Sequence, residues 1–130
     1  MEQIKKVMQG IMKGLAYLHK FGIMHRDIKL ENVMLRSLDS WEVVIVDFGL
    51  AVMSSDDEYI HYRCGTPGYI SPEVINMKGK EQLDVICDVF SAGVLFHVIL
   101  THRFLFPGSS SQEIYDKNKT FAFDLKGEMY

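Results

Sequence analysis

Several features that mark specialised classes of protein are absent from this sequence of 130 residues. There is no block of lysine and arginine, and the formal charge of −3 argues against a nucleic-acid partner. The longest uncharged run, residues 89–101, is too short to span a membrane and fits a buried helix better. The first residues lack the charged start and apolar run of a signal peptide, so none is expected.

Cysteine is also scarce. The two cysteines, Cys64 and Cys87, stand alone without the spacing of metal ligands. They are therefore expected to be reduced thiols in a cytoplasmic setting. Apolar residues make up 48% of the chain, which predicts a globular protein and argues against disorder. At this length we expect a single domain over residues 1–130.

The apolar pattern predicts a mainly α-helical chain with a small β-hairpin. Apolar residues recur with a 3.6-residue period over residues 3–20 and predict an amphipathic helix that ends near Lys20. Two short apolar runs, 33–35 and 43–46, are separated by a polar turn and predict the hairpin. Residues 83–100 are apolar on nearly every face, which predicts a central buried helix.

Signals for the start of a helix occur twice in the second half of the chain. Ser71 is followed by a proline, which predicts a helix that the serine caps. Ser110 and Glu113 have the spacing of a capping box, which predicts a short helix through Lys119. Residues 50–70 are mostly polar without a clear period, so we expect a mobile surface segment there.

Polar side chains that suit metal and phosphate flank the predicted hairpin. Asp27 and Asn32 precede its first strand and Asp47 follows its second, so the hairpin would bring them to one end. Carboxylate and amide oxygens suit magnesium, and the ammonium of Lys29 suits phosphate oxygens. The alternative for each residue taken alone is ordinary loop chemistry: a backbone cap, an Asx turn or a solvated lysine.

The chain resembles the catalytic domain of the eukaryotic protein kinases in a series of motifs that covers nearly its whole length. The motifs occur in family order: His25-Arg26-Asp27, Asn32, Asp47-Phe48-Gly49, Gly65-Thr66-Pro67-Gly68-Tyr69, Ser71-Pro72-Glu73 and Asp88-Val89-Phe90-Ser91-Ala92-Gly93. The resemblance implies the large, C-terminal lobe of the kinase fold. No glycine-rich loop or strand lysine of the small lobe occurs here, and the closing helices of the large lobe are missing. We therefore expect a lobe truncated at both ends, with the small lobe of the same domain as its partner.

The activity that the resemblance implies is transfer of the γ-phosphoryl group of ATP to a Ser or Thr hydroxyl of a protein substrate, with Mg²⁺. Lys29 and Thr66 favour serine/threonine over tyrosine specificity. The segments 64–69 and 104–108 resemble the calcium/calmodulin-dependent and calcium-dependent kinases. The alternative hypothesis is an inactive kinase-like fragment that acts as a protein-binding module. A metal phosphohydrolase would leave residues 65–73 unexplained.

The resemblance also implies a role for each motif residue. Asp27 would be the catalytic base, Lys29 would neutralise the transferred phosphate, and Thr66 would hydrogen-bond toward both. The nucleotide and metal positions are Lys29, Asn32, Met34 and Asp47, with Asn32 and Asp47 as magnesium ligands and Met34 as the floor under the adenine. Structural or regulatory roles fall to His25, Arg26, Phe48, Gly49, Tyr62, Glu73 and Asp88.

The structural and regulatory roles differ in kind. His25 and Phe48 would pack, and Gly49 would let the loop move Asp47. Asp88 would accept backbone N–H groups of the catalytic loop, which the resemblance places at residues 25–32. Arg26 indicates regulation by phosphorylation of the activation loop, because its guanidinium needs an anionic partner. The position where many relatives carry the phosphorylated threonine is Tyr62 here. Two alternatives follow: the acidic residues Asp56, Asp57 and Glu58 partly balance Arg26, or the phosphate is carried by Ser54, Ser55, Tyr59 or Tyr62. Glu73 would pair with an arginine that the sequence lacks, and Pro67 and Ile70 would line one substrate pocket.

Overall fold

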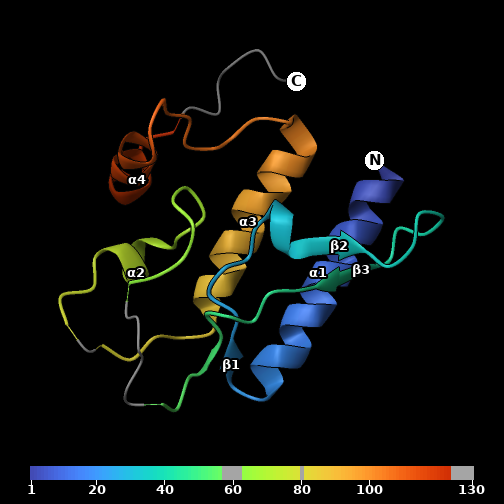
Figure 1. Cartoon of the computed structure of the whole chain (residues 1–130), viewed down its shortest axis with the longest axis horizontal. Coiled ribbons are helices and arrows are strands. Elements are labelled where there is room, and N and C mark those ends of the chain that lie inside the picture. The colour runs from blue at the N-terminus through green and yellow to red at the C-terminus, as the bar shows by residue number, and fades with distance from the viewer. Residues whose placement is uncertain (57–62, 80, 124–130) are drawn as a thin grey trace.

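A computed structural model of the protein describes residues 1–56, 63–79 and 81–123. In these ranges the chain forms four helices and two antiparallel sheets of two strands each (Figure 1). The helices are α1 (Glu2–Lys20), α2 (Pro72–Ile75), α3 (Ile86–Thr101) and α4 (Ser111–Thr120), with a 3₁₀ turn at Leu30–Asn32. The strands are β1 (Ile23–Met24), β2 (Val33–Leu35), β3 (Val43–Ile45) and β4 (Val52–Met53). The prediction of a mainly helical chain with a small β part is confirmed.

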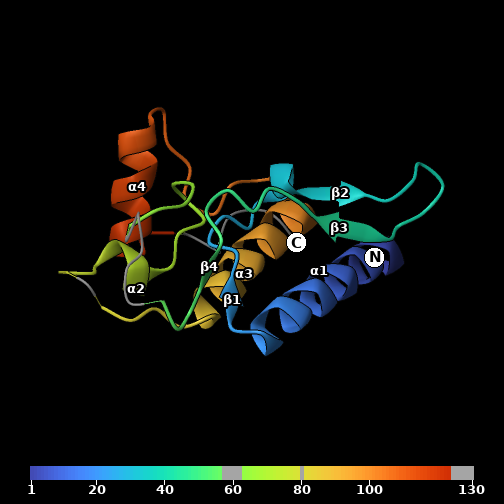
Figure 2. The ribbon, with the colours of Figure 1, turned by 60° about the horizontal axis from the view of Figure 1, so that its bottom comes forward.

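Helix α1 ends at Lys20, as its apolar period predicted. The residue that stops it is followed by Gly22, whose φ of +69° is easily adopted only without a side chain. Ile11 and Leu15 are buried on one face of α1, and this face packs against α3 (Figure 2). The amphipathic helix therefore forms one side of the core, with α3 beside it.

The predicted hairpin is present. Its strand β3 packs closely against α1 at two glycines of that helix, Gly10 and Gly14. An added Cβ would stand 2.6 Å from Cγ2 of Val43 at Gly10, and 2.9 Å from Cδ1 of Ile45 at Gly14. A side chain at either position would push strand β3 away from the helix. The close contact between α1 and β3 fixes the hairpin, and with it both loops that carry the predicted site residues (Figure 2).

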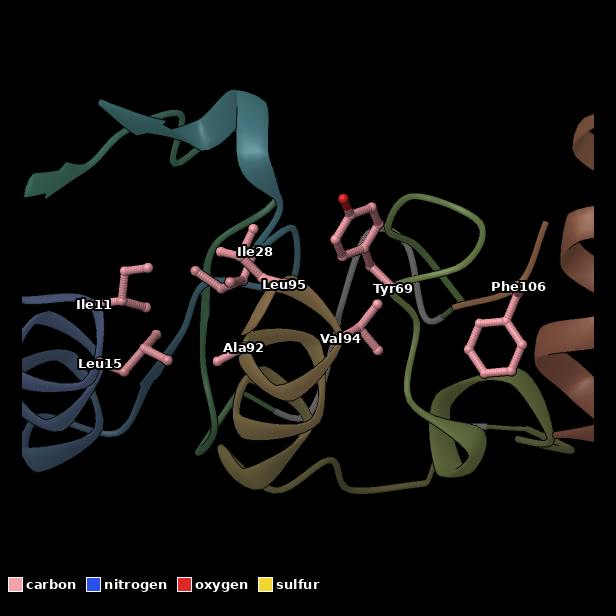
Figure 3. Close-up of a cluster of buried hydrophobic side chains, with 8 residues drawn as sticks. All are labelled: Ile11, Leu15, Ile28, Tyr69, Ala92, Val94, Leu95 and Phe106. Carbon is pink, nitrogen blue, oxygen red and sulfur yellow. The ribbon is translucent and has the colours of Figure 1, made fainter. Parts of the chain in front are cut away.

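The main core joins α1, α3 and the loops between them. Figure 3 shows its buried side chains: Ile11, Leu15, Ile28, Tyr69, Ala92, Val94, Leu95 and Phe106. Ile28 comes from the predicted catalytic loop, and Tyr69 from the segment before α2. Burial of each such side chain contributes about 1.5–3 kcal/mol. The loops that bear the polar residues are therefore anchored by core side chains on either side.

The expectation for residues 50–70 is wrong in part. Val52 and Met53 form β4, which pairs with β1 in a second antiparallel sheet. Gly68 and Tyr69 are buried. A two-residue strand is too short to show a period, and its partner lies far earlier in the chain, so the apolar pattern did not reveal it. Residues 57–62 lie outside the described residues.

Two predicted helix starts also need correction. Helix α3 begins at Ile86, three residues later than the apolar run, and Asp84 Oδ1 accepts the Ile86 N–H at 3.0 Å. Ser71 stands at the start of α2 but makes no capping bond. Its hydroxyl is buried without a hydrogen-bond partner among the described residues. The proline at the first position of α2 is present as predicted.

The start of α4 uses both residues of the predicted capping box, with one shift. The Ser110 hydroxyl accepts the N–H of Glu113 at 3.2 Å. The Glu113 carboxylate returns to the N–H of Ser109 at 2.8 Å, one residue earlier than the standard box. The Lys117 ammonium, 2.8 Å away, and then the bonds from Ser109 lower the pKa of Glu113 to about 2. In the described ranges, no helix has the length and apolar content needed to cross a bilayer.

Candidate active site

Asp27, Lys29 and Thr66 form a closed triangle of polar contacts. The Thr66 hydroxyl donates to Asp27 Oδ1 at 2.7 Å, and the Lys29 ammonium donates to the Thr66 hydroxyl at 2.8 Å. Lys29 Nζ also lies 3.1 Å from Asp27 Oδ2. The contacts expected between these three residues are present. They tie the loop after β1 to the loop before α2, across 39 positions of sequence.

Asn32 completes this group from the 3₁₀ turn that precedes β2. It is 5% exposed, and its Nδ2 donates to the backbone oxygen of Asp27 at 2.8 Å and to Asp27 Oδ2 at 3.1 Å. Among the described residues no hydrogen-bond donor faces its Oδ1. The amide therefore orients the Asp27 carboxylate and keeps an oxygen for another ligand.

His25 is buried, and both of its ring nitrogens are engaged. Nε2 lies 2.9 Å from the backbone oxygen of Val46, and Nδ1 accepts the N–H of Asp27 at 3.2 Å. These partners assign the proton to Nε2 in the neutral ring. The ring of Phe48 meets His25 edge-on, with 5.0 Å between the centroids. The geometry supports a packing role for His25 and leaves no nitrogen for a metal or a base.

Asp47 is held near Asn32 by the backbone. The N–H of Val46 donates to the Asn32 backbone oxygen at 2.9 Å, which places the next residue beside the Asn32 turn. Asp47 is exposed, and its Oδ1 accepts the Gly49 N–H at 3.1 Å. Its φ is +63°, and that of Arg26 is +67°. Residues other than glycine seldom adopt such angles, and where they do they cluster at functional sites.

The donor atoms of Asn32 and Asp47 fit magnesium. An amide oxygen and a carboxylate are hard ligands, and Mg²⁺ usually takes one or two protein oxygens and completes its shell with water and phosphate. Within the described ranges no group of three or more His, Cys, Asp or Glu is placed to hold a metal. A magnesium site that is completed by the phosphates of a nucleotide needs fewer than three such protein ligands.

One face of the hairpin is left apolar and open beside this group. Met34 on β2 stands opposite Val44 on β3, and they are 56% and 38% exposed. Their neighbours Val33 and Ile45 pack instead against the main core, because side chains alternate between the faces of a sheet. The exposed pair offers a flat apolar surface next to Asn32, where the sequence predicted the floor of an adenine site.

Asp88, at the start of α3, binds the backbone of the catalytic loop. Its side chain is fully buried and accepts the N–H of His25 and the N–H of Arg26, each at 2.8 Å. His19 Nε2 lies 2.9 Å from the same carboxylate. The contacts expected of Asp88 are present, and they hold Arg26 in its positive-φ conformation.

Replacement of Asp88 by asparagine is expected to destabilise the chain by about 1–3 kcal/mol, because an amide nitrogen would face a buried N–H and leave it unpaired. Urea unfolding of the 130-residue chain measures this. The matched control is Asp84→Asn at an exposed aspartate that also accepts a backbone N–H near the start of α3. Equal stability of the Asp88 and Asp84 variants would contradict the anchoring role of Asp88.

The predicted regulatory residues are only partly placed. Arg26 Nε donates to the backbone oxygen of Leu50 at 2.6 Å, which ties the catalytic loop to the segment after Asp47. Tyr62 lies outside the described residues, as do the acidic residues 57–58 and Tyr59. Glu73 is exposed at the start of α2. Regulation through Arg26 and these residues stays a prediction.

A pocket of about 210 Å³ opens beside Thr66. Pro67 and several apolar side chains line this pocket, and Glu31 is the one acidic residue among the described residues of its lining. Ile70, which was expected to share a pocket with Pro67, lines a separate cavity of about 10 Å³ together with Cys64 and Cys87. Both cysteines are free thiols, and burial raises the pKa of Cys87 to about 12.

Some contacts of the site were not predicted. His19 was treated only as part of α1, although it reaches Asp88 across 69 positions of sequence. Ser91 and Asn118 bind the backbone of residues 68–70 and were not singled out. Each is a polar residue in a helix, and nothing in the local pattern indicates a partner so distant in sequence.

Comparison with known proteins agrees with this geometry. Residues 1–126 match the protein kinase domain family. A probable myosin light chain kinase of Dictyostelium discoideum is 33% identical over 89% of the chain. The CBL-interacting serine/threonine-protein kinase 1 of Arabidopsis thaliana is 36% identical over 87% of it, and serine/threonine-protein kinase 33 of Bos taurus is 35% identical over 95%.

The chain spans only part of these relatives: 36% of the Dictyostelium protein, 25% of the Arabidopsis protein and 27% of the bovine one. The matched part contains the Asp27 and Asp47 motifs, which the structure brings to one end of the hairpin. The family match covers nearly all of the sequence, and the relatives named above are kinases. The chain therefore belongs to the family of protein serine/threonine kinases.

Proposed function

We propose that these residues are the phosphoryl-transfer part of a kinase that uses ATP and Mg²⁺ to phosphorylate Ser or Thr of a protein substrate. The observation that carries the proposal is the triangle of Asp27, Lys29 and Thr66, with its contacts of 2.7, 2.8 and 3.1 Å. It places a carboxylate and an ammonium side by side, which phosphoryl transfer to a hydroxyl requires.

Asp27 is the residue that receives the substrate hydroxyl. Its carboxylate is oriented by Asn32 and Thr66, so an approaching hydroxyl would find an acceptor already in position. As the phosphoryl group transfers, the hydroxyl proton passes to this carboxylate. The Thr66 hydroxyl keeps Asp27 and Lys29 together while the substrate is bound.

Lys29 and the metal ligands deal with the negative charge. The Lys29 ammonium, 3.1 Å from Asp27, would donate to an oxygen of the transferring group. Asn32 and Asp47 would hold magnesium through their side-chain oxygens, and the ion would neutralise charge on the phosphates. The Asp47 side chain is exposed, and the Gly49 N–H that donates to its Oδ1 holds the carboxylate in place.

The exposed apolar face of the hairpin supports a nucleotide above it. Met34 would lie under the adenine, and Leu95 and Ile99 belong to the core beneath the hairpin. Phe48 is 48% exposed although it packs on His25, so part of its ring is free for a further apolar contact. We infer that the small lobe of a kinase domain covers Met34 and Phe48, and that this lobe supplies the glycine-rich loop and the lysine for the phosphates.

The 130 residues alone are expected to show no turnover with ATP, magnesium and a mixture of Ser/Thr peptides, since no G-x-G-x-x-G loop occurs among them. A polypeptide that also contains this loop and the strand lysine should turn over at about 1–100 per second. Radiolabelled phosphate transfer measures both. Turnover by the 130 residues alone would contradict the proposal that the small lobe supplies groups needed for activity. A longer polypeptide that binds partner proteins but transfers no phosphate would favour the binding-module hypothesis.

A further inference from the structure

A buried asparagine of α4 holds the backbone that follows Thr66. Asn118 is 0% exposed. Its Oδ1 accepts the N–H of Gly68 at 3.0 Å, and its Nδ2 donates to the backbone oxygen of Ile70 at 2.9 Å. The amide thus binds the backbone donor that precedes Tyr69 and the backbone acceptor that follows it. A carboxylate of the same size offers only acceptors, and an apolar side chain offers neither.

Tyr69 itself is fixed from the other side. Its backbone oxygen accepts the Ser91 hydroxyl of α3 at 2.7 Å, and its N–H donates to the backbone oxygen of Thr66 at 3.0 Å. Its ring is buried in the main core (Figure 3). The segment from Thr66 to Ile70 is therefore held by side chains of α3 and α4. An arrangement of satisfied buried polar groups is rigid, because each alternative leaves one of them unpaired.

The same segment forms a wall of the pocket of about 210 Å³ beside Thr66. Ile114 lies one turn before Asn118 on α4 and lines this pocket too. Gly68 has a φ of +91°, and a Cβ built there would stand 3.2 Å from Cγ2 of Ile114. Helix α4 therefore meets the loop at two levels: Ile114 packs against it, and Asn118 binds its polar groups.

We propose that Asn118 is a positioning residue for the protein substrate. By fixing residues 68–70 it sets one wall of the pocket, while the Thr66 hydroxyl keeps its own contacts with Asp27 and Lys29. The inference rests on the proposed function. In the described part of the chain, the Asn118 side chain hydrogen-bonds to Gly68 and Ile70 and not to Asp27 or Asp47. Its loss should therefore weaken binding of the peptide and spare both ATP binding and the chemical step.

The first test is amide hydrogen exchange on the 130-residue chain, which needs no enzymatic activity. Asn118→Leu has a similar volume but cannot bind Gly68 or Ile70. Exchange in peptides that cover residues 65–71 should become about 10-fold faster or more, as expected for loss of buried hydrogen bonds. Exchange in α1 and α3 should stay unchanged. The matched control is Thr120→Val, because among the described residues the Thr120 hydroxyl bonds only to the backbone of its own helix.

A second variant guards against general unfolding. Asn118→Asp keeps an oxygen that can accept the Gly68 N–H but cannot donate to Ile70. It should bring exchange at the Gly68 N–H back toward the rate of the parent chain, because this oxygen still accepts that N–H. If Asn118→Leu left residues 65–71 unchanged, or speeded exchange equally throughout the chain, the positioning role would be overturned.

The second test is kinetic and uses a catalytic polypeptide that contains these 130 residues with a small lobe. Asn118→Leu should raise the KM for a Ser/Thr peptide about 10-fold and change kcat and the KM for ATP by less than about twofold. A fall in kcat at unchanged peptide KM, or an equal rise in both KM values, would overturn the proposal. An inactive parent polypeptide would refute the proposed function, whereas the exchange result would still decide whether Asn118 fixes the loop.

Discussion

Replacement of Asp27 by asparagine is expected to lower kcat by about 10²–10⁴-fold, as for loss of other general bases, with ATP affinity nearly intact. An amide cannot take the proton of the substrate hydroxyl. The amide nitrogen would also face either the two donors at the Oδ2 position, Asn32 Nδ2 and the Lys29 ammonium, or the Thr66 hydroxyl that donates to Oδ1. Steady-state kinetics with a Ser/Thr peptide, in a polypeptide that includes the small lobe, measures the effect.

The control for Asp27 is Asp39→Asn, an exposed aspartate in the turn between β2 and β3. It changes the net charge by the same amount but lies away from the triangle of Asp27, Lys29 and Thr66. Its kcat should match that of the parent. A normal kcat for the Asp27 variant at saturating ATP would show that the carboxylate is not the base.

Replacement of Asp47 by asparagine is expected to abolish productive magnesium binding. In the proposed site the carboxylate would supply the negative charge that binds the ion beside the phosphates of ATP, and an amide lacks that charge. Loss of groups that merely orient a metal ligand costs about 10–100-fold, so loss of the ligand charge should cost activity more than that. Activity titrated against MgCl₂ at fixed ATP, together with nucleotide binding in magnesium, checks this.

The two variants separate two roles at one site. The Asp47 variant should weaken nucleotide binding in the presence of magnesium, and the Asp27 variant should not. A high concentration of magnesium should not raise the kcat of the Asp27 variant, because the group that this variant lacks is the proton acceptor. If the Asp27 variant weakened nucleotide affinity as much as the Asp47 variant, and transfer stayed normal at saturating ATP, the assignment of the two carboxylates would be wrong.

Much of the candidate site at the end of the hairpin could be predicted from local sequence. The hairpin was visible because two apolar runs flank a polar turn, and its geometry alone brings Asp27 and Asn32 near the end where Asp47 emerges. The extent of α1 followed from its apolar period and from Gly22 after its end. Such features depend on residues close in the chain, so the order of side chains is sufficient to specify them.

The supports of the site could not be predicted in this way. The family resemblance implied the bonds from Asp88 to the catalytic loop, but nothing local indicated that His19 reaches Asp88 across 69 positions of sequence, or that Asn118 binds Gly68 across 50. Strand β4 pairs with β1 although neither is longer than two residues. Ser71 looked like a helix cap, but its hydroxyl is buried and makes no capping bond.

The sequence by itself determined the side chains to which we assign the proposed phosphoryl transfer and the short elements that carry them. Only the tertiary structure decided which polar groups pair across the chain. The physical reason is that a buried donor or acceptor must find a partner wherever packing places one, at a cost of about 1–3 kcal/mol if it fails. The packing of α1, α3 and α4 places Asp88 against the N–H of His25 and Asn118 against the N–H of Gly68.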